Sequence, residues 1–281
     1  MPKNYSYVKS YELKDLEDAD LYFFVHYQLY HSFLAFGNKY LNPKKCLIWF
    51  THPNNYVNFS HKSLIYSLNR AGVVFSTCTL WKNKLMEHRI NENKIVVPIG
   101  GADENIFLKS TQKSRTVIIS SASYERKNPV IIHELIEQRK DINFIILGPN
   151  WEKYTSFNQL ISCRNLRYLD VPYPEYPQYY AQASIYLSLS SLEGGPIPLI
   201  EAMMSNLIPV VTNTGFAKDV IKDGKNGLII ELSDLNINLI KNKIETAFNM
   251  EFDNRTYTLN NYSWSAFSKV IFSSIEKLLK K

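Results

Sequence analysis

Short runs of β-branched and other apolar residues recur along this chain, and stretches with helical character separate them. Asn128 and Pro129 predict the start of one such helix, over residues 130–138, with Asn128 as its N-cap. Alternating strands and helices are typical of a parallel sheet covered by crossover helices. The part beyond residue 105 therefore predicts one doubly wound α/β domain, with strands at Thr116–Ser120, Asn143–Leu147, Leu166–Leu169, 184–189, Ile208–Thr212 and Leu228–Ile230.

The first part of the chain shows the same alternation with less contrast, with strands expected at 21–25, Cys46–Phe50, Val73–Ser76 and 95–97. A break at residues 100–103, followed by a polar stretch over 109–115, marks the linker. We expect an N-terminal domain over 1–105, a C-terminal domain over 106–262 and a closing helix over 263–281. The first domain falls short of the roughly 150 residues of a typical domain, so we expect it to be abbreviated.

Charge and cysteine content exclude several classes of protein. The net charge of +6 is spread evenly over the two parts, which disfavours nucleic acid as a partner. The three cysteines, Cys46, Cys78 and Cys163, are isolated and predict buried packing rather than disulfides or a zinc site, and no histidine shows a spacing typical of metal ligands. No apolar stretch is long enough to cross a bilayer and no secretory leader opens the chain, so we expect a cytoplasmic protein.

The segment from Ser190 to Met203 follows a predicted buried strand and carries the most informative chemistry. In an open parallel sheet, ligands bind beyond the carboxyl ends of the strands. Gly194 and Gly195 leave room there for a phosphate to approach backbone amides. Pro198 predicts a helix start, whose exposed amides and dipole attract an anion.

Charged side chains flank this edge of the sheet. Glu193 in the loop and Glu201, expected in the first helical turn, are acceptor-only groups suited to sugar or ribose hydroxyls. Arg126 and Lys127 follow another strand and would project over the same edge, where they could bind a diphosphate. Each of these residues taken singly also fits a solvated surface or a turn. Together they favour a ligand of the nucleotide-sugar type.

These residues resemble the signature of family 4 retaining glycosyltransferases, which have the GT-B fold. The resemblance rests on Glu193, followed after seven residues by Glu201, with Gly194 and Gly195 between them. It extends from about residue 20 to the C-terminus through four further stretches, namely 94–107, 208–215, 223–228 and 262–264. It implies two Rossmann-like parallel-sheet domains that face a cleft, with the N-terminal one shortened.

The same resemblance implies retaining, metal-independent transfer of a sugar from a nucleotide-diphosphate sugar to a glycan or lipid-linked acceptor, with no cofactor besides the donor. Lys127 would stabilise the negative charge of the departing diphosphate, Glu201 would bind the ribose, and Tyr173 would lie near the nucleobase. Glu193 would hold the donor sugar and act in catalysis. The donor-binding residues implied are Arg126, Lys127, Tyr173, Glu193, Gly194, Gly195, Pro196, Ile197 and Glu201.

The chain departs from the family pattern at two places. Ala122 stands where the family commonly has an arginine, so Arg126 would have to compensate. The family's opening strand and glycine-rich acceptor-side loop have no counterpart before Tyr22. His52 and His26 follow predicted strands; we take His52 as a catalytic candidate that contacts the sugar, with a structural role as the alternative, and give His26 the structural role first.

Two other functions stay open. A nucleotide-sugar binding subunit without catalysis, completed by a partner chain or a second copy, would explain the short first part. A sugar-nucleotide epimerase would need an acid–base pair between the domains, which His26 and His52 do not convincingly supply. For a transferase with a lipid-linked acceptor, the mild positive charge fits peripheral contact at the inner membrane face.

Overall fold

The computed structural model describes residues 6, 9, 18–36, 41–51, 61–110 and 114–280. The chain groups into two compact units. Unit 1 comprises Met1–Ser76, Lys82–Val96 and Ser273–Lys281, and unit 2 comprises Thr77–Trp81 and Val97–Phe272. Among the described residues, no helix combines the length and the apolar character needed to cross a bilayer.

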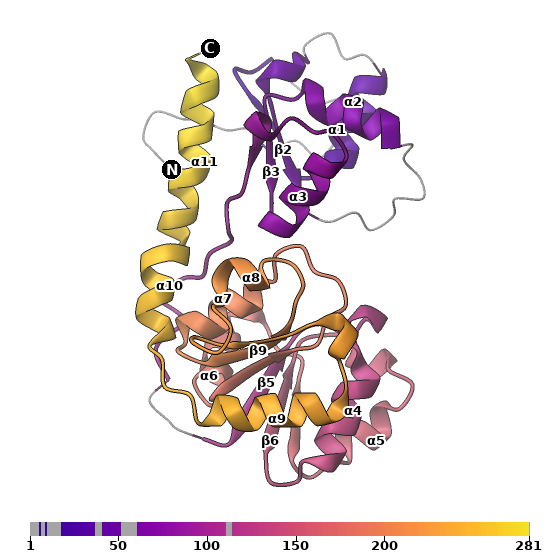
Figure 1. Ribbon diagram of the computed structural model, residues 1–281, viewed down its shortest axis with the longest axis vertical. Coiled ribbons are helices and arrows are strands. Elements are labelled where there is room, and N and C mark those ends of the chain that lie inside the picture. The colour runs from indigo at the N-terminus through magenta and orange to yellow at the C-terminus, as the bar shows by residue number, and fades with distance from the viewer. Residues whose placement is uncertain are drawn as a thin grey trace. The chain divides into compact units, whose positions relative to one another are not determined.

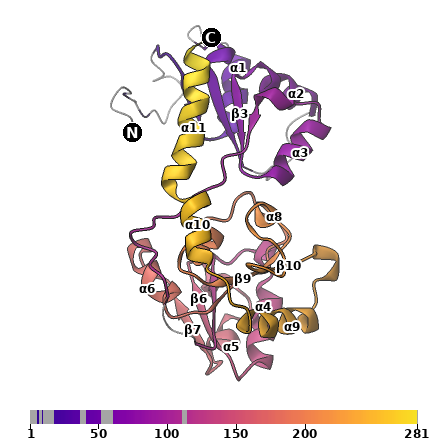
Figure 2. The ribbon, with the colours of Figure 1, turned by 60° about the vertical axis from the view of Figure 1, so that its left-hand side comes forward.

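Unit 1 is built on a four-stranded parallel sheet in the order β1-β2-β3-β4. Since the spatial order follows the chain order, right-handed crossovers place the connecting helices on one face. Figures 1 and 2 show these helices on one side of the sheet and the last turns of α11 (Trp264–Leu279) on the other. The elements are β1 (Tyr22–Phe24), α1 (Tyr27–Phe36), η2 (Pro43–Lys45), β2 (Cys46–Phe50), α2 (His61–Arg70), β3 (Val73–Ser76), α3 (Thr79–Glu87), η4 (Glu92–Lys94) and β4 (Ile95–Val96).

Unit 2 is built on a six-stranded parallel sheet in the order β10-β9-β8-β5-β6-β7. Its strands are β5 (Thr116–Ser120), β6 (Asn143–Leu147), β7 (Leu166–Leu169), β8 (Ile185–Ser188), β9 (Ile208–Thr212) and β10 (Leu228–Ile230). Its helices are α4 (Pro129–Gln138), α5 (Phe157–Ile161), α6 (Tyr176–Tyr180), α7 (Ile197–Met204), α8 (Ala217–Val220), α9 (Ile237–Phe248) and α10 (Asn254–Tyr262), with 3-10 turns η5 (Glu125–Lys127), η6 (Trp151–Lys153), η7 (Tyr173–Glu175) and η8 (Leu232–Asp234).

The strand predictions are confirmed, each within one residue of the observed bounds. The strands of unit 2 were recognisable because helices cover both faces of its sheet, so that the central strands are nearly continuous apolar runs. β5 is buried along its whole length. On one face, α4 and α9 lie side by side (Figure 1) and contribute Ile132, Ile136, Ile240 and Ile244 to the core.

The segment that follows β4 packs within unit 2. The Ala102 amide donates to the Tyr262 carbonyl at 3.2 Å, and the Arg255 guanidinium donates to the carbonyl of Glu104 at 3.0 Å and to that of Phe107. These bonds explain why unit 2 begins at Val97 rather than after residue 105, where the sequence suggested a boundary. The helix expected over 263–281 has its first turns in unit 2 and its last turns in unit 1.

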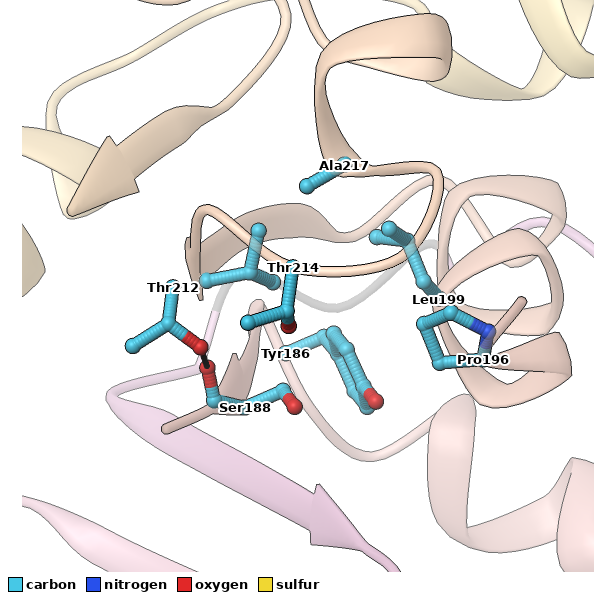
Figure 3. Close-up of a pocket in the computed structure, with 8 residues that line it drawn as sticks. Tyr186, Ser188, Pro196, Leu199, Thr212, Thr214 and Ala217 are labelled. Carbon is cyan, nitrogen blue, oxygen red and sulfur yellow. Dashed lines mark hydrogen bonds between the residues drawn. The ribbon is translucent and has the colours of Figure 1, made fainter. Parts of the chain in front are cut away.

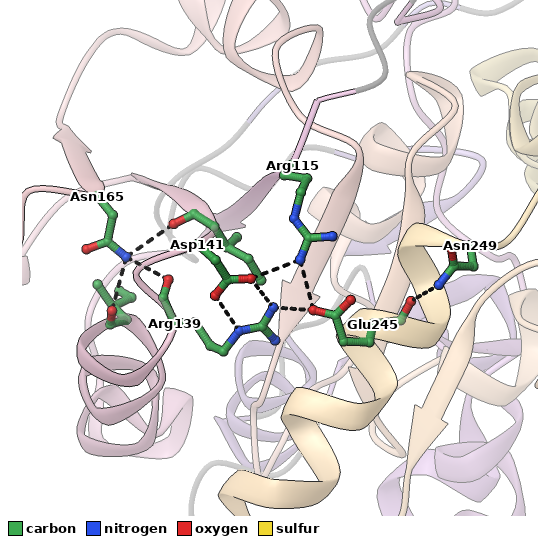
Figure 4. Close-up of polar contacts among 8 residues, drawn as sticks. Arg115, Arg139, Asp141, Asn165, Glu245 and Asn249 are labelled. Carbon is green, nitrogen blue, oxygen red and sulfur yellow. Dashed lines mark hydrogen bonds and ion pairs between the residues drawn. The ribbon is translucent and has the colours of Figure 1, made fainter.

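Two arginines and two carboxylates join the amino end of the sheet in unit 2 to α9 (Figure 4). Asp141 accepts from Arg139 Nε at 2.8 Å and from Arg115 Nη2 at 2.9 Å, and Glu245 on α9 bonds to both arginines. Nearby, the Asn165 amide donates to three backbone carbonyls around the turn after α4. This end of the sheet is opposite the edge where parallel sheets bind ligands, so the network is structural.

Candidate functional site

The sheet of unit 2 has a topological switch point between β5 and β8. From β5 the chain adds β6 and β7 on one side, and from β8 it adds β9 and β10 on the other. Ligands bind at such points, beyond the carboxyl ends of the two strands, because the two loops diverge and leave a crevice. The loop after β5 contains Arg126 and Lys127, and the loop after β8 contains Glu193, so the strand order brings the expected site residues together.

Several hydrogen bonds fasten the two loops to each other. The Ser191 amide donates to the Arg126 carbonyl at 2.7 Å. In return, Arg126 Nη1 donates to the Leu192 carbonyl at 2.6 Å, and Asn128 Nδ2 donates to the Leu189 carbonyl at 2.7 Å. Residues 126–128 are thus held against the glycine-containing loop.

Asn128 does not cap α4 through its side chain, as the sequence had suggested. Its φ is 55°, in the left-handed region that asparagine tolerates, and its side chain makes no capping bond. The side-chain amide is instead committed to Leu189 in the other loop. The helix does begin at Pro129, as expected, but Asn128 binds the loop after β8 rather than the first turn of the helix.

Glu193 is the common partner of both basic residues. Its side chain is only 8% exposed, its Oε1 lies 3.1 Å from Arg126 Nη1, and Lys127 Nζ donates to the same oxygen. Burial by itself would raise the pKa of Glu193, but the Lys127 charge and hydrogen bond outweigh it and hold that pKa below the ordinary value. Burial lowers the pKa of Lys127, and Glu193 opposes this shift. Two cations therefore share one buried carboxylate.

Packing explains the glycine in the middle of this loop. A Cβ on Gly195 would lie 2.8 Å from the Phe216 ring, so this position demands glycine for close packing within unit 2. Gly215, with φ of 55°, lies behind the same loop, and a Cβ there would be 2.9 Å from the Gly194 carbonyl oxygen. The expected role of Gly195, to let a phosphate approach backbone amides, stays a prediction beside this packing role.

Glu201 is buried on α7 rather than placed in the first helical turn. The helix begins at Ile197 with Pro198 as its second residue, so Glu201 lies in the second turn, with 2% of the residue exposed. Its Oε1 accepts a hydrogen bond from the Tyr173 hydroxyl at 2.5 Å, and its Oε2 accepts one from the Tyr180 hydroxyl at 3.1 Å. Burial raises the pKa of Glu201, and the two tyrosine hydrogen bonds oppose this shift.

The two tyrosines differ in exposure. Tyr180 lies on α6 and is fully buried, whereas Tyr173 in η7 is half exposed and leans on Phe107 and Tyr176, with ring centroids 6.2 and 5.4 Å away. The sequence identified Tyr173 but not Tyr180. The spacing of tyrosines at 173, 176, 179 and 180 is a helical pattern that could have shown that they share a side.

A cavity of about 350 Å³ lies over this edge of the sheet, within the range of roughly 300–1,000 Å³ that ligand sites occupy. It is bounded by the ends of β5 and β6, by η7 and by the start of α7, whose positive dipole end favours an anion. The small side chain of Ala122 lies in its wall, where the resembled family commonly has an arginine. The lining residues are Ser120, Ser121, Ala122, Leu147, Tyr173, Tyr176, Ile197, Pro198 and Glu201.

A second cavity, beneath the loop after β8, is too small for a substrate. Figure 3 shows the side chains of Tyr186, Ser188, Leu199 and Thr214 around it. Its volume is about 10 Å³, roughly the space that one water molecule needs. The larger cavity is therefore the candidate site.

The histidine candidates belong to unit 1 or to undescribed residues. His52 lies outside the described residues, so its catalytic role stays a prediction. His26 follows β1 and is exposed in unit 1. The predicted absence of a metal or cofactor at the donor site likewise stays a prediction.

Comparison with known proteins identifies the family and the fold. The sequence profile of the family described as "Glycosyl transferases group 1" matches residues 102–264, more than half of the chain. A comparison with curated protein sequences gave no match.

Solved structures resemble the chain over both units. HepE from Anabaena in complex with UDP aligns over 92% of this chain and 79% of its own, with 16% identity and a TM-score of 0.73. The apo form of the lipopolysaccharide outer core galactosyltransferase WaaB aligns over 92% of this chain and 75% of its own, with 14% identity and a TM-score of 0.69. A variant of TarM from S. aureus, in complex with fondaparinux, α-GlcNAc-glycerol and UDP, aligns over 87% of this chain and 54% of its own, with 18% identity and a TM-score of 0.68. These likenesses confirm the expected fold, two parallel-sheet α/β domains of the GT-B type with a shortened first domain.

Proposed function

Since this chain belongs to the glycosyl transferases group 1 family, we propose that it is a retaining glycosyltransferase of the family 4 type. It transfers a hexosyl unit from a nucleoside-diphosphate sugar to a hydroxyl of a glycan or lipid-linked acceptor, without a metal ion. The observation that carries the proposal is the cluster of Arg126, Lys127 and Glu193 at the switch point, next to a cavity that contains the Glu201 carboxylate.

The charge balance of this cluster suits a diphosphate. Arg126 and Lys127 together carry two positive charges against the single negative charge of Glu193, so the cluster is left with a net positive charge in a largely buried setting. A buried ion pair left with surplus charge gains from an additional anion. As the glycosidic bond breaks, negative charge grows on the leaving diphosphate, and the Lys127 ammonium stabilises it.

The Glu201 carboxylate suits the ribose. A carboxylate accepts hydrogen bonds only, and it has about four lone-pair positions, of which the tyrosines use two. Ribose hydroxyls can donate to the remaining positions or replace Tyr173. With Glu201 on the ribose, the nucleobase would occupy the part of the cavity near Tyr173 and Tyr176, and the start of α7 would face the phosphates.

Donor binding is the direct test. HepE and TarM, which resemble this chain, were each solved with UDP, which supports UDP-sugars as the first donors to examine. The full chain is mixed with UDP-, GDP- and ADP-sugars, and the melting temperature is followed for each. A ligand at about 100 times its dissociation constant stabilises by about 2.7 kcal/mol. A flat response to all three classes would contradict the donor site.

Catalysis and stereochemistry need a second measurement. With the donor identified, release of the nucleoside diphosphate is followed with candidate glycan and lipid-linked acceptors, and the anomeric configuration of the product is determined by NMR. Retention of the donor's α configuration supports the family 4 type of reaction. An inverted product would contradict it, even if transfer occurs.

A donor-binding subunit without activity of its own is the second candidate. The four-stranded sheet of unit 1, set against six strands in unit 2, favours it because the acceptor side is the smaller one. Donor binding without transfer or hydrolysis by the isolated chain, together with activity on adding a partner chain, would select this candidate.

A peripheral location at the inner membrane face belongs with a lipid-linked acceptor and is tested by flotation with anionic vesicles.

A further inference from the structure

Three side chains that could bind a metal ion converge in unit 2, on residues that the donor site does not use. They are His133, Glu137 and Cys163, and one ligand atom of each lies within 4.8 Å of the other two. His133 and Glu137 are four positions apart on α4 and so share one face of the helix. Cys163 follows the end of α5, so two separate elements supply the three groups.

The histidine ring is buried and lacks a partner on one nitrogen. Its side chain is 10% exposed, and Nδ1 lies 3.2 Å from the Tyr154 hydroxyl. Nε2 has no hydrogen-bond partner and points toward Glu137, whose Oε1 is 3.5 Å away. The tautomer that donates from Nδ1 to Tyr154 leaves an Nε2 lone pair facing carboxylate lone pairs, whereas the other tautomer carries its proton at Nε2. Metal binding selects the first tautomer. A cation placed between the two groups removes this conflict.

We propose that His133, Glu137 and Cys163 bind one divalent transition-metal ion, with Zn²⁺ as the best match. Imidazole nitrogen, carboxylate oxygen and thiolate sulfur are the ligands that zinc uses in proteins. Zinc–ligand bonds of about 2.0–2.3 Å at tetrahedral angles separate the ligand atoms by about 3.3–3.7 Å. The His133–Glu137 distance of 3.5 Å already fits, and the sulfur, which lies within 4.8 Å of both ligand atoms, has to approach by at most about 1 Å.

Charge and exposure are consistent with this ion. A neutral imidazole, a carboxylate and a thiolate carry two negative charges, which balance Zn²⁺; the thiol proton is released to solvent on binding. The Glu137 side chain is 54% exposed, so an ion can enter from that side and water can complete the fourth position. Since Cys163 packs into the core of unit 2, the ion would tie α4 to the turn between α5 and β7.

Cobalt(II) titration of the untagged, chelator-treated full chain tests the proposal, because a Co²⁺–thiolate bond gives a charge-transfer band in the near ultraviolet. We expect the band to saturate at one Co²⁺ per chain and Zn²⁺ to displace it. Cys163→Ser should abolish the band, whereas Cys46→Ser, the same change at another buried cysteine, should leave it. In addition, Zn²⁺ should raise the melting temperature of the wild type but not of Cys163→Ser.

Glu137 offers a variant with little risk to folding, because it is exposed on α4. Glu137→Gln should weaken Co²⁺ binding at least tenfold. Glu134→Gln makes the same change at another exposed position of that helix and should bind like the wild type. The proposal is overturned if no thiolate band forms with stoichiometric Co²⁺, if the band survives in Cys163→Ser, or if Glu137→Gln binds as tightly as Glu134→Gln. None of these outcomes depends on glycosyl transfer.

Discussion

The hydroxyl of Tyr173 donates a 2.5 Å hydrogen bond to Oε1 of Glu201, the carboxylate proposed to bind the ribose. Tyr180 donates to the other oxygen from a fully buried position, while Tyr173 is half exposed. Of the two donors, Tyr173 is therefore the one that can yield to a ribose hydroxyl. Tyr180 stays with the carboxylate and holds its orientation.

Removing the Tyr173 hydroxyl should change the pH dependence of activity. The hydrogen bond from Tyr173 lowers the pKa of Glu201, which burial raises. In Tyr173→Phe that pKa rises further, so the acid limb of the kcat/KM profile for the donor should move to higher pH. Tyr176→Phe is the matched control. Tyr176 also lines the cavity, but the hydrogen bonds that lower the pKa of Glu201 come from Tyr173 and Tyr180. If both variants leave the acid limb where the wild type has it, Glu201 is not the group that titrates.

Glu201→Gln should stabilise the protein while reducing turnover. The folded-state pKa of Glu201 is raised, so the ionised form costs stability at pH values above it. Gln keeps hydrogen-bonding capacity toward both tyrosines and removes the buried charge, which predicts a higher melting temperature by about 2–4 °C for a gain of about 1 kcal/mol. The difference should shrink as the pH falls toward the ordinary Glu pKa of about 4.3. Thermal unfolding at several pH values, beside kcat, measures both effects; a destabilised variant at neutral pH would contradict the assignment.

Lys127→Met should lower kcat by about a hundredfold, the usual effect of removing one group that stabilises transition-state charge. Methionine keeps the aliphatic packing, and Glu193 keeps Arg126 as a partner at 3.1 Å. Steady-state kinetics with saturating donor separate this loss from weaker binding. Lys153→Met, at an exposed position after β6, serves as the control and should behave as wild type. An unchanged kcat in Lys127→Met would rule out the leaving-group role.

Gly195→Ala should destabilise unit 2 and displace the loop, because its Cβ would lie 2.8 Å from the Phe216 ring. We expect a loss of about 1–3 kcal/mol, as for other overpacked sites. Phe216→Leu makes room for the methyl group, so the double variant should be more stable than the sum of the single effects predicts. If the changes in melting temperature of the two single variants simply add up in the double variant, contact with the Phe216 ring is not the reason that position 195 requires glycine.

Asp141→Asn should lower the melting temperature at neutral pH, and this loss should diminish only in strong acid. The pKa of Asp141 is lowered, first by its hydrogen bond from Arg139, so its contribution to stability is fully present above the ordinary Asp pKa of about 3.9 and is lost only as the pH falls through the much lower folded-state pKa. Because the side chain is 55% exposed, the effect should stay near 1 kcal/mol or less. Glu231→Gln, in the exposed pair with Lys218, is the control with a smaller expected effect. Melting curves between pH 7 and 3 compare the two variants. The gap for Asp141→Asn should persist over this range and begin to narrow only below about pH 3.9; a gap that has vanished by about pH 5 would contradict the ionic origin.

Part of the donor site could be read from local patterns. The apolar runs predicted the strands, and the resemblance singled out Glu193, Glu201 and Lys127. The structure places Glu201 in the wall of the cavity and pairs Lys127 with Glu193 at the same edge of the sheet, outside the residues that line the cavity. The local pattern could not predict how deeply each of these side chains is buried or which residues it contacts. Whether Glu201 lies in the first or the second turn depends on where α7 begins, and whether it is exposed or buried depends on the elements that pack around that helix.

The sequence by itself determined that the second half is a doubly wound α/β domain with a nucleotide-sugar motif, because periodicity and turn residues act over a few positions. Only the tertiary structure decided the partnerships, since Lys127 and Glu193 are 66 positions apart and meet through the strand order at the switch point. The tertiary structure likewise brings the Tyr180 hydroxyl to Glu201, and Cys163 to His133 and Glu137. Such contacts depend on which elements pack together, and the spacing of residues within one segment does not predict that packing.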